Sequence, residues 1–134
     1  AKGKHTFILS DEIYLLCQHE YAANFLFTLW KRVRKYGAYA TGITQNVDDL
    51  LQSHTARTML ANSEFLIMLN QASTDRIELA KLLNISDLQL SYITNVDAGH
   101  GLIKVGSSLV PFANKFPKNT KLYKLMTTKP GEGV

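Results

Sequence analysis

Apolar residues follow two kinds of pattern along the chain. Three short runs, at 5–10, 38–44 and 64–69, are rich in β-branched and aromatic side chains, which predicts three strands. Residues 21–36 instead place apolar side chains every three or four positions, which predicts one amphipathic helix that ends at Gly37. Because the run at 64–69 is apolar from Phe65 to Leu69, we expect this strand to be covered on both faces.

Further helices are predicted after the second and third strands. Helical segments follow the second strand at 47–53 and 55–62, and another follows the third strand at 75–83. Two sets of side chains have the types and spacing of helix N-caps: Ser73 or Thr74, and Ser86 with Gln89 in a capping box. Alternation of strand and helix over this length predicts a parallel α/β sheet with right-handed crossovers.

The pattern changes in the last third of the chain. Residues 101–112 read as two strands around a turn at Gly106 and Ser107, which predicts a β-hairpin. Residues 120–127 are expected to form one more strand, and 128–134 to form a flexible tail. Residues 1–134 are therefore expected to be a single domain, since the length is that of one domain.

The composition indicates a globular protein and argues against a disulfide-stabilised or membrane-spanning one. With 134 residues and 46% hydrophobic residues the chain can bury a core, and its single cysteine cannot form an internal disulfide, which fits a reducing compartment. No apolar run approaches the length of a membrane span. The chain lacks an initiator methionine and begins almost on a strand, so we expect it to be a fragment of a longer protein. The formal net charge of +4 permits contact with nucleic acid or an anionic membrane, although solvated surface lysines also explain it.

Polar side chains follow the first two strands at the points where these strands end. Asp11 and Glu12 come directly after the first strand, and Gln45 follows the second. Ligands of open parallel sheets bind at the carboxyl ends of the strands, where these side chains would converge. An apolar strand that ends in Asp-Glu has the arrangement of a Walker B motif. The alternative is that both acids only begin a helix, where carboxylates suit the helix dipole.

Three arginines are weaker candidates for a role at a phosphate site. Arg34 lies at a predicted helix end just before the second strand, where it could reach across a subunit boundary as an arginine finger. The alternative is an ordinary cation at a helix C-terminus, and Arg57 and Arg76 are of the same type. The chain contains no GxxxxGK[ST] motif, so it lacks the loop and lysine that hold phosphates in P-loop NTPases.

Four segments taken in order resemble one family. They are TFILSDEIYLL, LWKRVRKYGAYATGITQNVDDLL, ARTMLANSEFLIMLNQASTDRIELAKLLNIS and GHGLIKVGSSLVPF. Together they resemble the C-terminal half of the VirB-type conjugation ATPases of type IV secretion systems, RecA-like motors of the HerA/FtsK class. The likeness is greatest to the Gram-positive conjugative-element branch. The resemblance implies an α/β fold that is part of a RecA-like P-loop NTPase core, with a C-terminal β-hairpin and without its Walker A part.

The resemblance also implies roles for individual residues. Asp11 corresponds to the Walker B aspartate of the metal site, and Glu12 to the catalytic glutamate. Gln45 corresponds to the glutamine that senses the γ-phosphate. Arg34 corresponds to the arginine that acts on the nucleotide of the neighbouring subunit in hexamers. Arg57 and Arg76 lie in similar motifs without an assigned role.

The implied cofactors and partners belong to the intact protein. It is expected to use ATP and Mg²⁺ and to couple hydrolysis to the transfer of DNA or protein. Its partners would be other subunits of a hexamer, type IV secretion channel components, a coupling protein and DNA, at the cytoplasmic face of the membrane. The fragment is expected to bind no cofactor and to be inactive, because it lacks Walker A. The competing hypothesis is a non-catalytic basic module that binds nucleic acid or protein through its lysines, arginines and aromatic residues.

Overall fold

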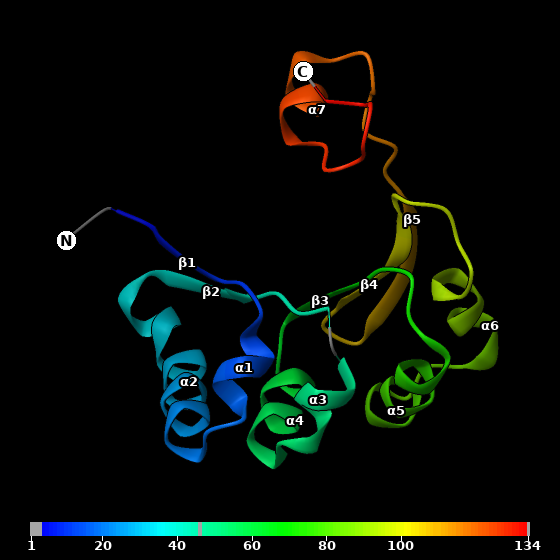
Figure 1. Cartoon of the computed structure of the whole chain (residues 1–134). Coiled ribbons are helices and arrows are strands. Elements are labelled where there is room, and N and C mark those ends of the chain that lie inside the picture. The colour runs from blue at the N-terminus through cyan, green and yellow to red at the C-terminus, as the bar shows by residue number, and fades with distance from the viewer. Residues whose placement is uncertain (1–3, 46, 134) are drawn as a thin grey trace.

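The computed structural model describes residues 4–45 and 47–133, which form an α/β fold with two small sheets (Figure 1). Strand β1 (Thr6–Ser10) pairs in parallel with β2 (Ala38–Gly42). Strands β3 (Phe65–Met68), β4 (His100–Val105) and β5 (Ser108–Ala113) form an antiparallel sheet in that order. The predicted α/β class, with a parallel sheet flanked by helices, is confirmed.

The helices connect the strands in the predicted order. In chain order they are α1 (Ile13–Cys17), α2 (Glu20–Arg32), the 3-10 helix η1 (Val33–Tyr36), α3 (Val47–Gln52), α4 (His54–Ala61), α5 (Ser73–Leu83), α6 (Asp87–Leu90), the 3-10 helix η2 (Ser91–Ile93) and α7 (Lys121–Met126). Gly37 ends η1 with φ 66°, a left-handed conformation that glycine adopts without strain. The capping box of Ser86 and Gln89 and the hairpin turn at Gly106 are also confirmed.

Helices α1 to α6 lie on one side of the strands, below them in the view of Figure 1. Two apolar clusters fill the space between the layers. The first joins α3, α5 and the second sheet around Ile93 and Leu102, which are fully buried. The second joins α1, α2, α3 and α4 around Leu26 and Met59. Within the described residues no helix is long and apolar enough to cross a membrane.

Strand β3 departs from the sequence-based expectation in two respects. It pairs antiparallel with β4 and not with β2, so the strand layer is interrupted between β2 and β3. Its outward residues Phe65 and Ile67 are 64% and 66% exposed, so the expected cover on both faces is wrong for this chain. The helices cover one face of β3, where Met68 is buried, and no described residue covers the other face.

The C-terminal residues correct a further expectation. Residues 120–127 do not form a strand, because Thr120 caps the helix α7 by accepting a hydrogen bond from the backbone N–H of Tyr123. Glu132 folds back onto α7, where it pairs with Lys118 at 3.0 Å and accepts a short hydrogen bond from the Tyr123 hydroxyl. The expected cap of α5 is also wrong: its N-cap is Ala72, and no side chain caps it.

Candidate functional site

The carboxyl ends of β1 and β2 lie at the same edge of the parallel sheet. Ser10 is the register partner of Gly42, the last residue of β2. Two backbone hydrogen bonds of 2.9 Å extend the pairing beyond the strands: Ile43 N–H donates to the Ser10 carbonyl, and Ile13 N–H donates to the Ile43 carbonyl. The structure thus brings the chain segments that carry Asp11, Glu12 and Gln45 to one edge.

Glu12 occupies an unfavourable backbone conformation at this edge. Its φ of 47° and ψ of 46° are left-handed, and it precedes α1 as the N-cap. The other described non-glycine residues with positive φ are asparagines, Asn84 and Asn95, which tolerate this conformation better than glutamate does. Backbone strain of this kind persists where surrounding contacts impose it, and it is concentrated at functional sites.

The Glu12 side chain adds a second unusual feature. Its Oε2 atom is buried and has no hydrogen-bond partner among the described residues. Native structures pair most buried polar atoms, so such an oxygen marks a position where a ligand, ion or water belongs. Together with the strained backbone, it identifies Glu12 as the most constrained acid of the sheet edge.

Asp11 and Gln45 are both exposed. Asp11 Oδ1 accepts a 2.9 Å hydrogen bond from the Glu12 N–H, which fixes the carboxylate next to the strand end. The carboxylate oxygens of Asp11 and the amide oxygen of Gln45 are of the kind that bind Mg²⁺ directly or accept hydrogen bonds from its bound waters.

The side chains at this edge could supply only part of the ligands of a metal ion, and waters and phosphates would have to supply the rest. No cluster of three or more acidic, histidine or cysteine side chains suited to a metal occurs in the described part of the chain. Mg²⁺ in nucleotide sites is commonly bound by one or two carboxylates, with waters and phosphates completing its shell. Asp11 could provide such a carboxylate, so the residues present are compatible with Mg²⁺ brought by a nucleotide.

Arg34 lies at the opposite end of the strand pair. It belongs to η1, which directly precedes β2, whereas Gln45 follows β2. The five residues of β2 separate the two ends by roughly 17 Å. Arg34 is exposed and forms no ion pair with any described residue. The structure therefore does not bring Arg34 to Glu12 within one chain.

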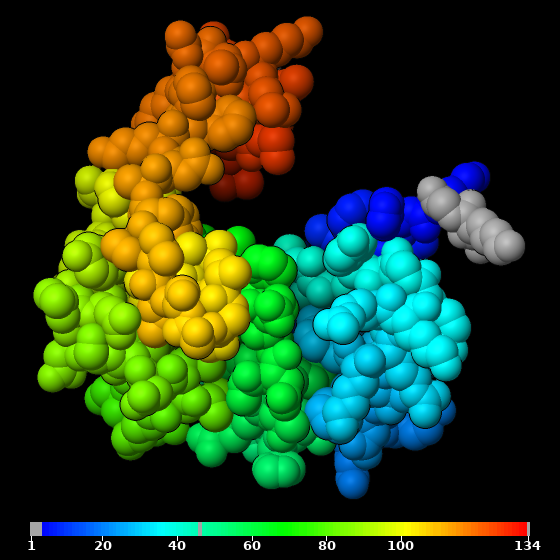
Figure 2. Space-filling model, turned by 180° about the vertical axis from the view of Figure 1, so that it is seen from behind, coloured from blue at the N-terminus to red at the C-terminus, as the bar shows by residue number. Residues whose placement is uncertain are grey.

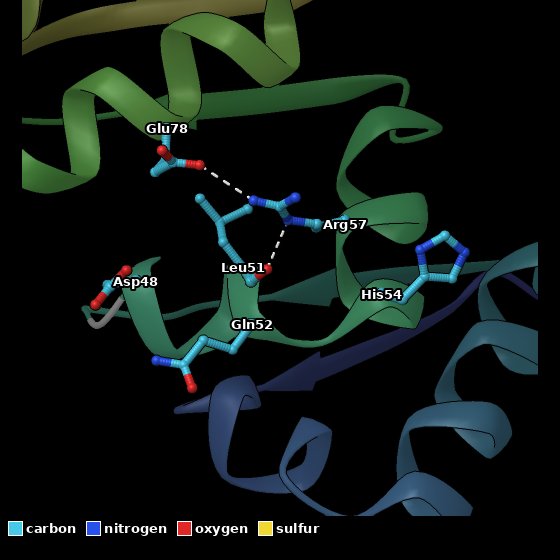
Figure 3. Close-up of a pocket in the computed structure, with 6 residues that line it drawn as sticks. All are labelled: Asp48, Leu51, Gln52, His54, Arg57 and Glu78. Atoms are coloured by element: carbon cyan, nitrogen blue, oxygen red, sulfur yellow. Dashed lines mark hydrogen bonds and ion pairs between the residues drawn. The ribbon is translucent and has the colours of Figure 1, made fainter.

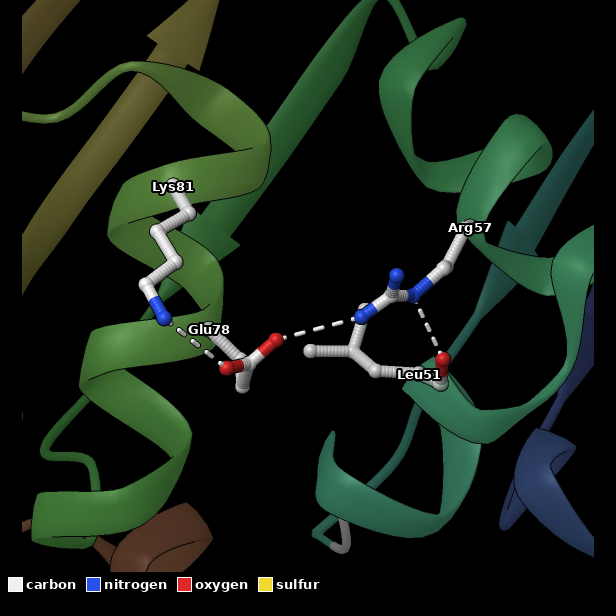
Figure 4. A network of polar contacts seen from close by, with 4 residues as sticks. All are labelled: Leu51, Arg57, Glu78 and Lys81. Carbon is white, nitrogen blue, oxygen red and sulfur yellow. Dashed lines mark hydrogen bonds and ion pairs between the residues drawn. The ribbon is translucent and has the colours of Figure 1, made fainter.

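Arg57 joins three helices (Figure 4). From α4 its Nε donates a 2.6 Å hydrogen bond to the Leu51 carbonyl at the end of α3, and its guanidinium forms a 3.1 Å ion pair with Glu78 of α5. Glu78 also pairs with Lys81 at 3.5 Å. These contacts give Arg57 a structural role that the sequence did not indicate.

The same arginine lines a shallow pocket of about 370 Å³ between α3, α4 and α5 (Figure 3). Its lining is mostly polar: Asp48, Leu51, Gln52, His54, Arg57 and Glu78. The Arg57 guanidinium in this pocket is already engaged by a carboxylate and a carbonyl. Arg76 lies half-buried in the first turn of α5, and no side-chain contact with a described residue assigns it a role.

Sequence reasoning located the acids of the sheet edge but missed their geometry. Glu12 has a left-handed backbone conformation, which Asn adopts more readily than Glu does. The residue type at position 12 therefore gave no sign of this conformation, which only the structure shows. The Arg57–Glu78 pair spans 21 residues, so no local spacing rule predicts it.

Comparisons with a family model and with solved structures both found matches. The family model of the TraG P-loop domain matches residues 1–104. The chain belongs to the TraG P-loop domain family. Among solved structures it is similar to VirB4 of Thermoanaerobacter pseudethanolicus, with 27% sequence identity and a TM-score of 0.79. The match covers 85% of this chain and 32% of that one, so the TraG-family chain described here spans about a third of the VirB4 structure.

The comparison with curated proteins gave no match. The two matches confirm the resemblance to type IV secretion and conjugation ATPases that the sequence motifs suggested.

Proposed function

We propose that this TraG-family chain forms the hydrolytic half of an ATP-driven motor of type IV secretion or conjugation. The observation that carries the proposal is the strained Glu12 with its unpaired buried oxygen, at the edge where β1 and β2 end together. In the intact protein, ATP hydrolysis at this edge would drive the transfer of DNA or protein.

Each residue at the edge has a distinct proposed task. The Asp11 carboxylate would hold Mg²⁺ through water, and Glu12 would polarise the water that attacks the γ-phosphate. The Gln45 amide would orient that water or detect the γ-phosphate from the neighbouring strand end. Bound Mg²⁺ would supply charge stabilisation of the transferred phosphoryl group.

The chain by itself lacks the other half of such a site. It has no GxxxxGK[ST] motif, and no described strand fills the interruption between β2 and β3. Without a phosphate-binding loop, affinity for nucleotide should be weak and hydrolysis absent. We therefore assign activity to a longer VirB4-type polypeptide that contains this sequence.

Arg34 would act on a second subunit. Because it lies at the end of β2 away from Gln45, it cannot serve the site of its own chain, but its exposed position suits contact with the site of a neighbour. A guanidinium that enters a phosphoryl-transfer site from the next subunit stabilises the developing charge. This arrangement requires a ring, for which a hexamer is the expected state.

The proposed partners and location follow from the motor function. The ring would dock on secretion channel components and receive substrate from a coupling protein at the cytoplasmic face of the membrane.

Substitution of Glu12 in the longer polypeptide tests the proposal. Glu12→Gln keeps the side-chain size and removes the charge, so ATP turnover should fall by at least ~100-fold, with nucleotide affinity changed by less than about threefold. Lys81→Ala, on the exposed side of α5, is the matched control and should leave turnover within about twofold. Turnover of Glu12→Gln close to that of the wild type would refute the assignment.

A second candidate function is binding of nucleic acid by the basic C-terminal residues. Residues 114–133 carry five lysines and one glutamate, a net +4 that equals the charge of the entire chain. A fall in DNA affinity of several tens-fold between 50 and 200 mM salt, as expected for about three or four phosphate contacts, would support it. If Glu12→Gln also left the ATP turnover of the longer polypeptide unchanged, this function would replace the motor.

A further inference from the structure

Gly42 ends β2 at the sheet edge that carries Glu12, and it leaves no space for a side chain there. A β-carbon added to Gly42 would lie 2.5 Å from Ile13 Cδ1 and 3.3 Å from Trp30 Cη2, closer than the 3.4–4 Å of ordinary van der Waals contacts. The backbone of Gly42 does not itself require glycine, since Gly42 is not among the described glycines with positive φ. The close approach of the isoleucine and tryptophan side chains is therefore what favours glycine at this position.

Ile13, whose side chain lies next to Gly42, is held in place by a hydrogen bond and by packing. It is the first residue of α1, and its N–H donates a 2.9 Å hydrogen bond to the Ile43 carbonyl directly after β2. Its side chain is only 5% exposed and belongs to the apolar cluster around Leu26 and Met59. A β-branched side chain in a packed core has little freedom to rotate. Ile13 Cδ1 therefore cannot swing into solvent to make room for a larger residue at position 42.

The fixed position of Ile13 constrains Glu12, which directly precedes it. Only Asp11 and Glu12 connect Ser10, the last residue of β1, to the first residue of α1. Because both ends of this connection are hydrogen-bonded to the residue that follows β2, the turn from strand to helix falls on these two residues, and Glu12 makes it with φ 47°. Such a conformation persists where the surrounding structure imposes it. The space beside Gly42 is thus one condition for the backbone strain and the buried Oε2 of Glu12.

We propose that Gly42 is a positioning residue for Glu12. Gly42 acts by leaving space for Ile13, which in turn sets the place of the Glu12 carboxylate at the sheet edge. A β-carbon at position 42 would displace Ile13 or the strand end by roughly 1 Å, and an error of about 1 Å at a reacting group can cost about 100-fold in rate. This role of Gly42 rests on the proposed function of Glu12 in ATP hydrolysis.

The alternative is that Gly42 serves packing alone. Residues 4–45 pack into one body at one end of the molecule, blue to cyan in Figure 2, in which the last residue of β2 meets Trp30 of α2. On this alternative Gly42→Ala would lower the free energy of unfolding but leave the turnover of the folded protein unchanged. Measurements of turnover per folded molecule separate the two roles.

Gly42→Ala and Gly101→Ala are compared in the longer VirB4-type polypeptide. Gly101 in β4 is the matched control, because a β-carbon there would lie 2.4 Å from the Met68 carbonyl oxygen, which is equally crowded but in the other sheet. Per folded molecule, Gly42→Ala should lower kcat at least ~10-fold, with nucleotide affinity changed by less than about threefold. Gly101→Ala should keep kcat within about threefold of the wild type. An equal loss of kcat in both variants, or no loss in Gly42→Ala, would overturn the inference.

Ile13→Val tests the path from Gly42 to Glu12, because it removes the Cδ1 atom that lies closest to the added carbon. In the Ile13→Val background, Gly42→Ala should lower kcat by less than about threefold, against a loss of ~10-fold or more beside isoleucine. The same loss in both backgrounds would show that Ile13 does not transmit the effect, and the positioning role would be wrong.

A readout without nucleotide is the three-bond coupling between the amide and α protons of Glu12, which reports φ in the 134-residue chain. Gly42→Ala should change this coupling, Ile13→Val combined with Gly42→Ala should return it towards the wild-type value, and Gly101→Ala should leave it unaltered. A coupling that does not respond to Gly42→Ala would contradict the positioning role whatever the kinetics. Glu12→Gln separates the two proposals. If it leaves ATP turnover intact, the proposed function fails, whereas an inactive Glu12→Gln beside a fully active Gly42→Ala removes only the role of Gly42.

Discussion

Replacing Glu12 by asparagine should raise the free energy of unfolding while it removes the proposed catalytic carboxylate. Glu12 is held at φ 47°, where a residue with a β-carbon is disfavoured, and its Oε2 is buried without a partner. Asparagine adopts this left-handed conformation more readily than glutamate does. The chain uses asparagine at its two other non-glycine positions of this kind in the described residues, Asn84 and Asn95.

The size of the effect follows from three contributions. A left-handed residue other than glycine costs about 1–2 kcal/mol, part of which asparagine recovers. Removal of an unpaired buried oxygen adds up to about 1 kcal/mol. Loss of a negative charge at the start of α1 subtracts about 0.3–1 kcal/mol. The net gain should be about 1 kcal/mol, which corresponds to a rise in Tm of about 3–5 °C for a domain of this size.

Urea unfolding of the 134-residue chain, followed by circular dichroism, measures the change. Glu12→Gln is the control, because it keeps the strained backbone and loses the same charge, so it should be no more stable than the wild type. A loss of stability in Glu12→Asn, or an equal gain in Glu12→Gln, would show that backbone strain at residue 12 is not the cause. A gain in stability with loss of ATP turnover in the longer polypeptide is the expected signature of a functional site.

Three other predictions concern the fold around the site. Arg57→Ala should lower the free energy of unfolding by about 1–2 kcal/mol in urea titrations, through the lost carbonyl contact more than the half-exposed ion pair, whereas Lys81→Ala should change it by less than about 0.5 kcal/mol. Gly101→Ala should lower the free energy of unfolding by about 1–3 kcal/mol, because the added β-carbon would lie 2.4 Å from the Met68 carbonyl oxygen. Thermal unfolding measures the change, and an unchanged Tm would contradict the close packing of the two strands. Hydrogen bonds from Tyr123 and Lys118 lower the pKa of Glu132, so its contribution to stability is present above the pKa of an unfolded glutamate and is lost as pH falls through the lower folded pKa. The protection of the α7 amides relative to their intrinsic exchange rates should therefore fall in that acidic range, and Glu132→Gln should remove this fall.

Local signals in the sequence predicted the elements that depend on neighbouring residues. Alternation and apolar spacing located β1, β2 and α2, and the glycine after η1 ended the helix as expected. The hairpin of β4 and β5 also followed from local turn chemistry at Gly106. These features are set by contacts close in sequence, which a single chain displays directly.

The predictions that proved wrong concern features that depend on residues distant in the sequence. Residues 120–127 alternate enough to suggest a strand, but Thr120 caps a helix and Glu132 closes a loop onto it. The apolar run of β3 suggested cover on both faces, and the strand pairs with β4, some 35 residues later, while its outer face remains exposed. The sequence placed Asp11, Glu12 and Gln45 at one edge, but the left-handed backbone of Glu12 became visible only in three dimensions.

The central claim is that Glu12 serves the site of its own subunit while Arg34 serves the site of a neighbour, and mixing of inactive subunits tests it most directly. Glu12→Gln and Arg34→Ala are prepared separately in the longer VirB4-type polypeptide, and both should be inactive. In a one-to-one mixed ring, roughly a quarter of the interfaces would combine an intact Glu12 with an intact neighbouring Arg34. Steady-state ATP turnover of the mixture should therefore recover to roughly a quarter of the wild-type value. A mixture that exchanges subunits and stays as inactive as either variant would contradict the account.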